Sequence, residues 1–165
     1  MSSVVLDASA LLALLLGEPG ADKVKAALDG SLMSVVNMAE VVSHYAKLGA
    51  ARQDIEVLLR PLPIRLVPLD AALSYDAGML RPITLEGGLS LGDRCCLALA
   101  RREGRPALTA ERRWPLIAEA AGVVVELVRG TLVEPREGRL SQNSSRNGRA
   151  ITLVGVQGLI AAARA

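Results

Sequence analysis

The sequence predicts an α/β protein in which about five parallel strands form a central sheet flanked by helices. Short runs rich in Val, Ile and Leu alternate, over the first 130 residues, with longer segments of helix-forming residues. The runs lack the strict apolar–polar alternation of a half-exposed strand, which indicates strands covered on both faces. Turn residues separate the segments, an order that is typical of strand–helix–strand units.

Five runs are expected to form the strands, because they are short, apolar and mostly rich in β-branched residues. The first of them ends at Asp7 and the last follows Gly122. The expected strands cover residues 4–6, 33–36, 64–69, 107–109 and 123–128.

The segments between these runs are expected to form helices, and several carry signals for their ends. Asp70 and Ser90 are suited to cap helix N-termini. Gly49, Gly104 and Gly122 stand where helices should stop. The expected helices cover residues 8–16, 21–28, 38–48, 54–59, 70–80, 90–102 and 114–121.

Composition and charge limit the function. The net charge of the 165-residue chain is only +2, which excludes a protein that holds nucleic acid by bulk charge alone. The chain has no Phe, one Trp and two Tyr, which argues against modules that stack bases on aromatic side chains. If the protein binds phosphate, the positive charge must be local, and a bound divalent cation would supply it.

The length predicts one domain, which we assign to residues 1–130. Residues 131–165 carry excess positive charge and begin with a stretch rich in Arg, Ser, Asn and Gly. We expect this stretch to be a basic linker that leads to a short apolar C-terminal extension of unassigned role.

The sequence also favours a cytoplasmic protein without a membrane segment. No charged region or cleavage site of a signal peptide is found at the N-terminus, and the apolar run at residues 8–16 is too short to cross a bilayer. Cys95 and Cys96 are adjacent within an apolar run, where we expect two buried, unbridged thiols. With one His, His44, the chain has no zinc-site spacing.

Four carboxylates occupy comparable places relative to the expected strands and helices. Asp7 ends the first strand, Glu40 and Asp93 are expected in the first turns of helices, and Glu111 follows the fourth strand. The C-terminal ends of parallel strands and the helices that follow them share one edge of a sheet, where ligand sites gather. The sequence therefore predicts a cluster of four acids.

Clustered carboxylates repel one another, and a hard divalent cation among them removes that cost. Oxygen ligands without a His or Cys cluster suit Mg²⁺ or Mn²⁺. Such a site fits cleavage of a phosphodiester bond, in which the cation activates water and stabilises the leaving oxygen.

Three of the acids also have a structural interpretation. Residues 90–93 have the form of a capping box, and residues 37–40 fit a similar scheme. Glu111 could pair with a neighbouring arginine on the surface. Asp7 is harder to explain in this way, because an acid that follows a buried strand is desolvated unless it has a partner or a ligand.

The segments around these acids resemble the four motifs of the PIN-domain (PilT N-terminus) ribonucleases, in particular the VapC toxins of VapBC toxin–antitoxin systems. The resemblance covers residues 3–129, and the third motif is the most specific match. The motifs are VLDASALLA at residues 5–13 with GEPG at 17–20, NMAEV at 37–41, LSLGDR at 89–94 with CLALA at 96–100, and LTAER at 108–112 with Trp114.

The resemblance implies a three-layer fold and a Mg²⁺- or Mn²⁺-dependent endoribonuclease that acts on RNA. It also implies a homodimer and a cognate antitoxin, of which a residue, often Arg, enters the acidic pocket. By position, Asp7 and Asp93 would be the principal metal ligands, and Glu40 and Glu111 would complete the catalytic pocket. Ser9 would bind a phosphate or a metal-bound water.

Two alternatives stay open at this point. The fourth motif of the family usually carries Asp where this chain has Glu111, so the protein could be a catalytically weak PIN domain that acts as a binding partner. A phosphatase with Asp7 as nucleophile is a further alternative, although that chemistry typically has a second acid two residues on, where this chain has Ser9. For a homodimer, the amphipathic helices near residues 41–48 and 55–59 are candidates to pack across a two-fold axis, but the sequence alone does not locate the interface.

Overall fold

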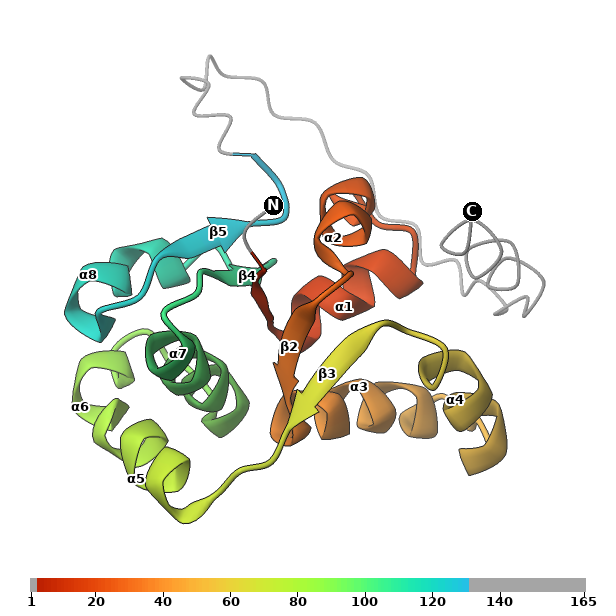
Figure 1. Cartoon of the computed structure of the whole chain (residues 1–165), viewed down its shortest axis with the longest axis horizontal. Helices are drawn as coiled ribbons and strands as arrows, with labels where there is room; N and C mark the ends of the chain where they lie inside the picture. Colours follow the sequence, from red (N-terminus) through yellow and green to blue (C-terminus); the bar gives the residue numbers. More distant parts are fainter. Residues whose placement is uncertain (1–2, 131–165) are drawn as a thin grey trace, which may run out of the picture. The chain divides into compact units, whose positions relative to one another are not determined.

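The computed structural model describes residues 3–130, which form a five-stranded sheet covered by helices (Figure 1). The strands lie in the order β3-β2-β1-β4-β5, and every neighbouring pair is parallel. This architecture confirms the predicted fold class. The strands are β1 (Val5–Leu6), β2 (Ser31–Ser34), β3 (Ile64–Val67), β4 (Ala107–Thr109) and β5 (Val125–Leu127).

The helices begin and end mostly where the capping signals predict. Asp70 accepts a hydrogen bond from the backbone N–H of Leu73, and Gly104 and Gly122 end their helices with positive φ angles of 61° and 66°. The helices are α1 (Ala8–Leu15), α2 (Ala21–Ala27), α3 (Val35–Lys47), α4 (Arg52–Leu59), α5 (Ala71–Met79), α6 (Arg81–Thr84), α7 (Leu91–Glu103), the 3-10 helix η1 (Trp114–Leu116) and α8 (Ala118–Ala121).

Helix α7 is the centre of the core on one side of the sheet. It packs against β1, β2 and β4 and against α5, and its residues from Cys95 to Ala100 are all buried. Helices α1 and α2 pack together, and their buried residues Leu11, Leu14 and Val24 lie outside the α7 cluster. Because successive residues of a strand face opposite sides of the sheet, Val5 packs in the α7 cluster and Leu6 faces the opposite side of the sheet.

The junction of β2 and α3 differs from the prediction. Residues 33–36 were expected to form a strand, yet α3 begins at Val35, because the Ser34 hydroxyl accepts a hydrogen bond from the N–H of Val36 at 3.2 Å and caps the helix. This cap overrides the strand preference of the two valines. Asn37 therefore does not cap the helix but lies within its first turn, and Glu40 follows in the second turn.

The segment before β5 also differs from the prediction. A continuous helix was expected over residues 114–121, but the chain forms η1 and then α8, with Ile117 between them at a φ angle of −113°. The short helix α6, which has Pro82 in its first turn, was not predicted. Trp114 is 1% exposed, so burial of its ring in the core determines the path of this segment more than helix preference does.

The predicted basic linker and apolar extension, residues 131–165, lie outside the described residues, so the division of the chain at residue 130 stays a prediction. Within residues 3–130, no helix is long and apolar enough to span a membrane. Cys95 and Cys96 are buried and unbridged, as expected.

Candidate active site

The three central strands bring the predicted acidic motifs to one edge of the sheet. Strands β2, β1 and β4 are neighbours and parallel, so their C-terminal ends lie side by side (Figure 1). Asp7 follows β1, helix α3 follows β2 directly, and Glu111 lies two residues after β4. The N-terminal turn of α7 reaches the same place, because the Gly92 carbonyl accepts a hydrogen bond from Asn37 of α3.

Asp7 is the most enclosed of the predicted acids, with 2% of its surface exposed. As the N-cap of α1, it accepts a hydrogen bond through Oδ2 from the N–H of Ser9, and the Ser9 hydroxyl donates to the same oxygen. The Thr109 hydroxyl, which comes from β4, donates to Oδ2 at 2.9 Å. Its other oxygen, Oδ1, accepts from Asn37 Nδ2 at 3.1 Å. Four donors therefore hold both oxygens of this buried carboxylate.

Ser9 has several partners within the protein. Besides its bond to Asp7, the Ser9 hydroxyl lies 3.2 Å from the Thr109 hydroxyl and accepts a hydrogen bond from the N–H of Ala110 at 3.0 Å. The sequence predicts a contact of Ser9 with a phosphate or with a metal-bound water. Within the protein, the contacts of the hydroxyl fix Asp7 against the end of β4, and the contact with phosphate or water stays a prediction.

Glu40 and Asp7 are joined by Asn37, a residue that the sequence analysis considered only as a helix cap. Asn37 is fully buried, and its Nδ2 lies 3.2 Å from Glu40 Oε2 as well as 3.1 Å from Asp7 Oδ1. Its Oδ1 is buried without a hydrogen-bond partner among the described residues. In the sequence, Asn37 and Glu40 are three residues apart, which is nearly one helical turn. This spacing indicates that both side chains share a face of α3.

Asp93 serves both as a helix cap and as a member of the acidic group. It forms a capping box with Ser90, in which its Oδ2 accepts from the Ser90 N–H at 2.7 Å and its own N–H donates to the Ser90 hydroxyl at 3.1 Å. The structural interpretation of residues 90–93 is thus confirmed. The Ser90 hydroxyl is also 3.5 Å from Glu40 Oε1, which connects the α7 cap to the acid of α3.

Glu111 stands apart from the other three acids. Its side chain is exposed, and within residues 3–130 its carboxylate makes no hydrogen bond or ion pair. Its backbone N–H donates to the Thr109 hydroxyl at 3.0 Å, so only the main chain of Glu111 joins the network around Asp7. No ion pair with a neighbouring arginine forms in the described part either.

Burial and mutual repulsion perturb the acids of the cluster. Burial raises the pKa of Asp7, and the charge of Asp93 raises it further, while the Ser9 and Thr109 hydroxyls oppose the rise. Burial likewise raises the pKa of Glu40, with the charges of Asp7 and Asp93 acting in the same direction. The three acids are therefore close enough to affect one another, and no positive side chain of the described residues lowers the pKa of Asp7 or Glu40.

The chemistry of the donors fits a hard divalent cation. Asp7, Glu40 and Asp93 supply carboxylate oxygens, and the unpartnered Oδ1 of Asn37 is a further oxygen donor. As they stand, no three His, Cys, Asp or Glu side chains of residues 3–130 are arranged as a metal site. The Asn37 amide nitrogen bonds to both Asp7 and Glu40, whose oxygens a cation would need.

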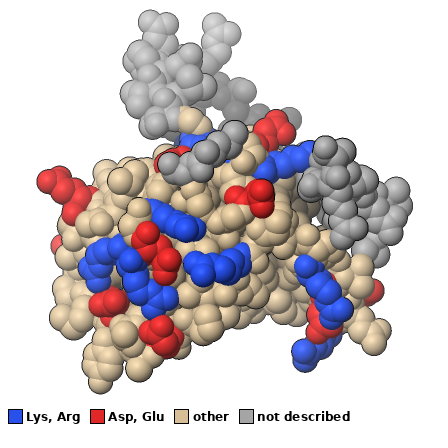
Figure 2. Space-filling view, in the orientation of Figure 1, with Lys and Arg blue, Asp and Glu red and all other residues tan. Residues whose placement is uncertain are grey.

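Positive and negative side chains are interspersed on the face of the protein shown in Figure 2. Ion pairs between such side chains include Arg101–Asp76 at 3.6 Å and Arg102–Asp70 at 2.8 Å. A mixed surface of this kind agrees with the near-neutral net charge and does not favour binding of nucleic acid by bulk charge.

Comparisons with known proteins agree with this fold. Residues 4–120 match the model of the PIN domain family. A structure of a toxin–antitoxin complex from Klebsiella pneumoniae is 22% identical, with a TM-score of 0.57, and covers 74% of this chain and 96% of that one. No curated protein matches the chain.

Two further solved structures have the same fold at lower identity. DNA-bound VapBC from Salmonella typhimurium is 14% identical with a TM-score of 0.59, over 78% of this chain and 99% of that one. VapBC2 from Rickettsia felis, bound to a promoter DNA fragment, is 14% identical with a TM-score of 0.55, over 75% of this chain and 97% of that one.

Proposed function

The chain belongs to the PIN domain family, and from this premise we propose that it is a Mg²⁺- or Mn²⁺-dependent endoribonuclease that acts as the toxin of a type II toxin–antitoxin pair. The observation that carries the proposal is the convergence of Asp7, Glu40 and Asp93 at one edge of the sheet. The negative charges of these carboxylates repel one another there, and a bound cation would relieve the repulsion. The toxin–antitoxin complexes among the similar structures support the biological role.

Asp7, Asp93 and Glu40 are the residues that would hold the cation. When bound, a divalent cation supplies positive charge that lowers the pKa of water and stabilises charge on phosphate oxygens. Asp7 is fixed for this role by the hydroxyls of Ser9 and Thr109, which direct its carboxylate without neutralising it. Asp93 is fixed differently, because the backbone N–H of Ser90 donates to its carboxylate.

Glu40 is the proposed proton acceptor. It is partly exposed, whereas Asp7 is buried, so water and the scissile phosphate can reach it. Its carboxylate, which Asn37 and Ser90 contact through their side chains, would accept a proton from the attacking water. Glu111, at the exposed rim, is proposed to complete the pocket only once substrate or a cation draws its side chain inward.

The two alternatives are separated by specific observations. The exposed position of Glu111 favours the catalytically weak PIN domain as the second candidate, because a fourth acid then contributes little to cation binding. A phosphatase that uses Asp7 as nucleophile is disfavoured, because both Asp7 oxygens are occupied by donors and the side chain is 2% exposed.

An RNA digestion assay tests the proposed function. Purified full-length chain is treated with EDTA and then given RNA with Mn²⁺, with Mg²⁺ or with neither, and the cut ends are sequenced. We expect cleavage only with a divalent cation, a loss of about 10²-fold or more for Asp93→Asn, and unchanged cleavage for Asp76→Asn, a surface acid paired with Arg101. Undiminished cleavage by Asp93→Asn contradicts the proposal, and absence of cleavage by a folded, cation-binding wild type favours the binding-module alternative.

The antitoxin part of the proposal has its own test. We expect expression of the chain alone to stop bacterial growth, and Asp93→Asn to relieve that arrest. Co-expression of a cognate antitoxin, sought among small proteins encoded directly upstream, should restore growth and inhibit RNA cleavage in the purified complex. Growth arrest by the Asp93→Asn variant would show that toxicity has a source other than this site.

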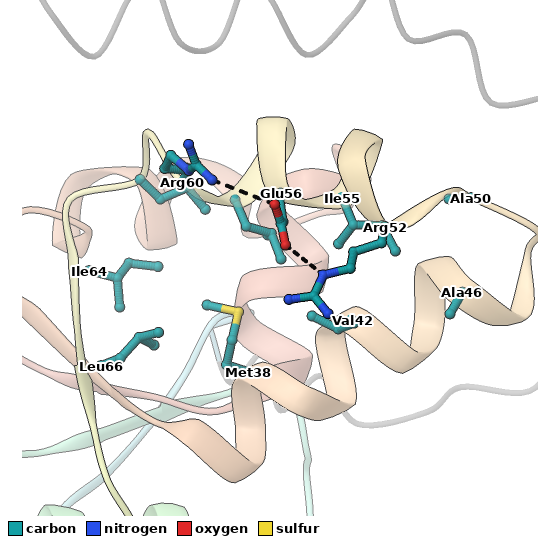
Figure 3. Close-up of a pocket in the computed structure, with 12 residues that line it drawn as sticks. Met38, Val42, Ala46, Ala50, Arg52, Ile55, Glu56, Arg60, Ile64 and Leu66 are labelled. Carbon is teal, nitrogen blue, oxygen red and sulfur yellow. Dashed lines mark hydrogen bonds and ion pairs between the residues drawn. The ribbon is translucent and has the colours of Figure 1, made fainter.

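The homodimer part of the proposal rests on an apolar groove beside α3. The groove has a volume of about 720 Å³ and lies between α3, α4 and β3 (Figure 3). Met38, Val42 and Ala46 line it from α3, and Ile64 and Leu66 line it from β3. The two amphipathic helices that are candidates to pack across a two-fold axis thus border this apolar groove.

Charge at the rim of this groove favours a second copy of the chain as the occupant. Arg52 and Arg60 flank Glu56 on α4, with ion pairs of 2.7 and 3.5 Å (Figure 3). An alternating row of this kind is self-complementary, because Glu56 of one copy can face an arginine of the other across a two-fold axis. We therefore propose the α3–α4 groove as the dimer interface.

A further inference from the structure

The amide of Asn37 uses its two polar atoms unequally. Nδ2 has two protons but three acceptors within 3.2 Å, namely Asp7 Oδ1, Glu40 Oε2 and the Gly92 carbonyl oxygen. Oδ1, on the other side of the same amide, is buried and has no partner among the described residues. A buried carbonyl oxygen without a donor costs free energy. The amide keeps this orientation because Nδ2 donates to the three acceptors, although the orientation leaves Oδ1 without a partner.

The reason for this orientation is electrostatic. Carboxylate oxygens of Asp7 and Glu40 approach the amide, and an amide oxygen turned toward them would add repulsion, whereas N–H groups donate to them. A divalent cation bound to the same two carboxylates would reverse this preference. The amide nitrogen would then face a positive charge, and the amide oxygen would become the favourable atom on that side.

We propose, on the basis of the proposed function, that Asn37 is a positioning residue whose amide turns over when a divalent cation binds, so that Oδ1 replaces Nδ2 toward Asp7 and Glu40 and joins the oxygen donors of the cation. A half-turn about the Cβ–Cγ bond exchanges the two atoms, and the planar amide fills nearly the same space in both orientations. In the turned orientation the unpartnered oxygen gains a partner.

This arrangement explains why an amide stands at a position where a carboxylate would bind a cation more strongly. Without a cation, Asn37 donates to two acids that no positive side chain of residues 3–130 balances, and so holds the site together. Its three hydrogen bonds must break before Oδ1 can turn inward. Asn37 therefore stabilises the site before a cation binds and weakens cation binding relative to an acid at the same position.

Two substitutions at position 37 separate the roles of donor and ligand. Asn37→Asp keeps an oxygen and removes the donors, whereas Asn37→Leu has a similar size and removes both. We expect Mn²⁺ to bind about tenfold more tightly to Asn37→Asp and about tenfold more weakly to Asn37→Leu than to the wild type, as measured by electron paramagnetic resonance of free Mn²⁺. Thr84→Val, which removes a buried hydroxyl bonded to the Leu80 carbonyl, should bind Mn²⁺ like the wild type.

Melting temperatures measured in EDTA and with Mn²⁺ show whether each variant is folded without a cation. Asn37→Asp adds a carboxylate beside Asp7 and Glu40, so its melting temperature should be lower than that of the wild type in EDTA and should rise more on addition of Mn²⁺. Equal Mn²⁺ affinity in Asn37→Leu and the wild type would overturn the proposal, and so would an Asn37→Asp protein that Mn²⁺ does not stabilise more than the wild type.

A measurement on the unaltered protein gives a further test. The chain has three Asn and three Gln residues, so few side-chain amide signals compete in a ¹H–¹⁵N spectrum, and the pair missing from Asn37→Leu identifies Asn37. We expect this pair to shift on titration with Mg²⁺, because Nδ2 loses its carboxylate acceptors. A pair that stays in place at saturating Mg²⁺ overturns the proposal.

The failure of this proposal can be distinguished from the failure of the proposed function. A wild type that binds and uses Mn²⁺ for RNA cleavage, while Asn37→Leu binds Mn²⁺ equally well, refutes the role of Asn37 alone. A folded wild type that binds neither Mn²⁺ nor Mg²⁺ refutes both.

Discussion

The carboxylate of Glu40 lies in the space that a side chain at position 92 would fill. A Cβ atom built on Gly92 would meet both Glu40 oxygens at less than any normal contact distance. Gly92 is buried in the first turn of α7, and its carbonyl oxygen accepts a bond from Asn37. Glycine is therefore needed here for the close approach of α3 and α7 at the site, and not for an unusual backbone conformation.

Gly92→Ala should expel the Glu40 carboxylate from its place and lower activity more than stability. Because only the end of a flexible side chain must move, we expect a loss below about 1 kcal/mol in the free energy of unfolding and a loss of RNA cleavage of about tenfold or more. Urea denaturation and the RNA assay measure the two effects. Gly78→Ala is the matched control, because a Cβ on this exposed residue of α5 meets no atom within 4 Å. A Gly92→Ala protein as stable and active as the wild type would contradict the close packing.

Asp7→Asn should stabilise the cation-free protein. Burial raises the pKa of Asp7 in the folded state, so between its unfolded and folded pKa the folded protein binds more protons, and stability falls as the pH rises through this range. At neutral pH, the substitution removes the cost of a buried charge and should raise the free energy of unfolding by more than about 0.5 kcal/mol.

The pH dependence of this effect identifies its cause. Near pH 4 the gain from Asp7→Asn should be smaller than at pH 7, because Asp7 is then protonated to a larger extent in the folded wild type. Urea denaturation in EDTA at both pH values measures the difference, with the exposed Asp76→Asn as control. An Asp7→Asn protein that is less stable than the wild type at pH 7 would show that the hydrogen bonds to Asp7 outweigh its desolvation.

Removal of the hydroxyls around Asp7 should change the pH dependence of RNA cleavage. The Ser9 and Thr109 hydroxyls lower the pKa of Asp7 by donating to its carboxylate. In Ser9→Ala and Thr109→Val this pKa should rise further, so the acidic limb of the rate profile should move to higher pH. Rates measured across pH with Mn²⁺ check this, with Ser43→Ala of α3 as control. An unmoved acidic limb in both variants would argue that Asp7 does not limit the rate.

Glu111→Ala should affect cleavage less than Asp93→Asn does. The Glu111 side chain is exposed and makes no contact with the other acids in the described part of the chain, whereas the charge of Asp93 acts on both Asp7 and Glu40. We expect Glu111→Ala to retain cleavage within about tenfold of the wild type. A loss as large as that of Asp93→Asn would show that Glu111, once drawn inward, contributes as much to the pocket as Asp93 does.

Val42→Asp should convert the proposed homodimer to a monomer. Val42 lines the apolar groove from α3 and is 37% exposed, so an acid there disfavours burial against a second copy. Sedimentation of the full chain measures the mass, and Val124→Asp, a substitution at a residue that is 68% exposed beside β5, is the control. A monomeric wild type would refute the dimer, and a dimeric Val42→Asp would place its interface elsewhere.

Much of the fold was predictable because its signals are local. Asp70 and Ser90 mark the starts of α5 and α7 through hydrogen bonds that close within three residues, and Gly104 marks a helix end through its positive φ angle. The short apolar runs predicted all five strands, because a strand that is buried on both faces consists almost entirely of apolar residues.

Local signals failed where distant contacts decide. Val35 and Val36 have the composition of a strand, but the Ser34 cap and the packing of α3 on β2 and β3 place both in a helix. The early start of α3 moves Asn37 from a capping position to the buried centre of the site. Likewise, burial of Trp114 in the core divides the expected last helix into η1 and α8.

By itself, the sequence determined the order of strands and helices, the parallel sheet and the set of acids that follow strands or begin helices, because these depend on residue type and spacing. Only the tertiary structure decided which side chains meet: Asp7 and Glu40 are joined through Asn37, Gly92 makes room for Glu40, and the Glu111 side chain stays outside. The physical reason is that hydrogen bonds and steric fit act over a few ångströms between residues far apart in the chain, so they exist only once the sheet has brought its strand ends together.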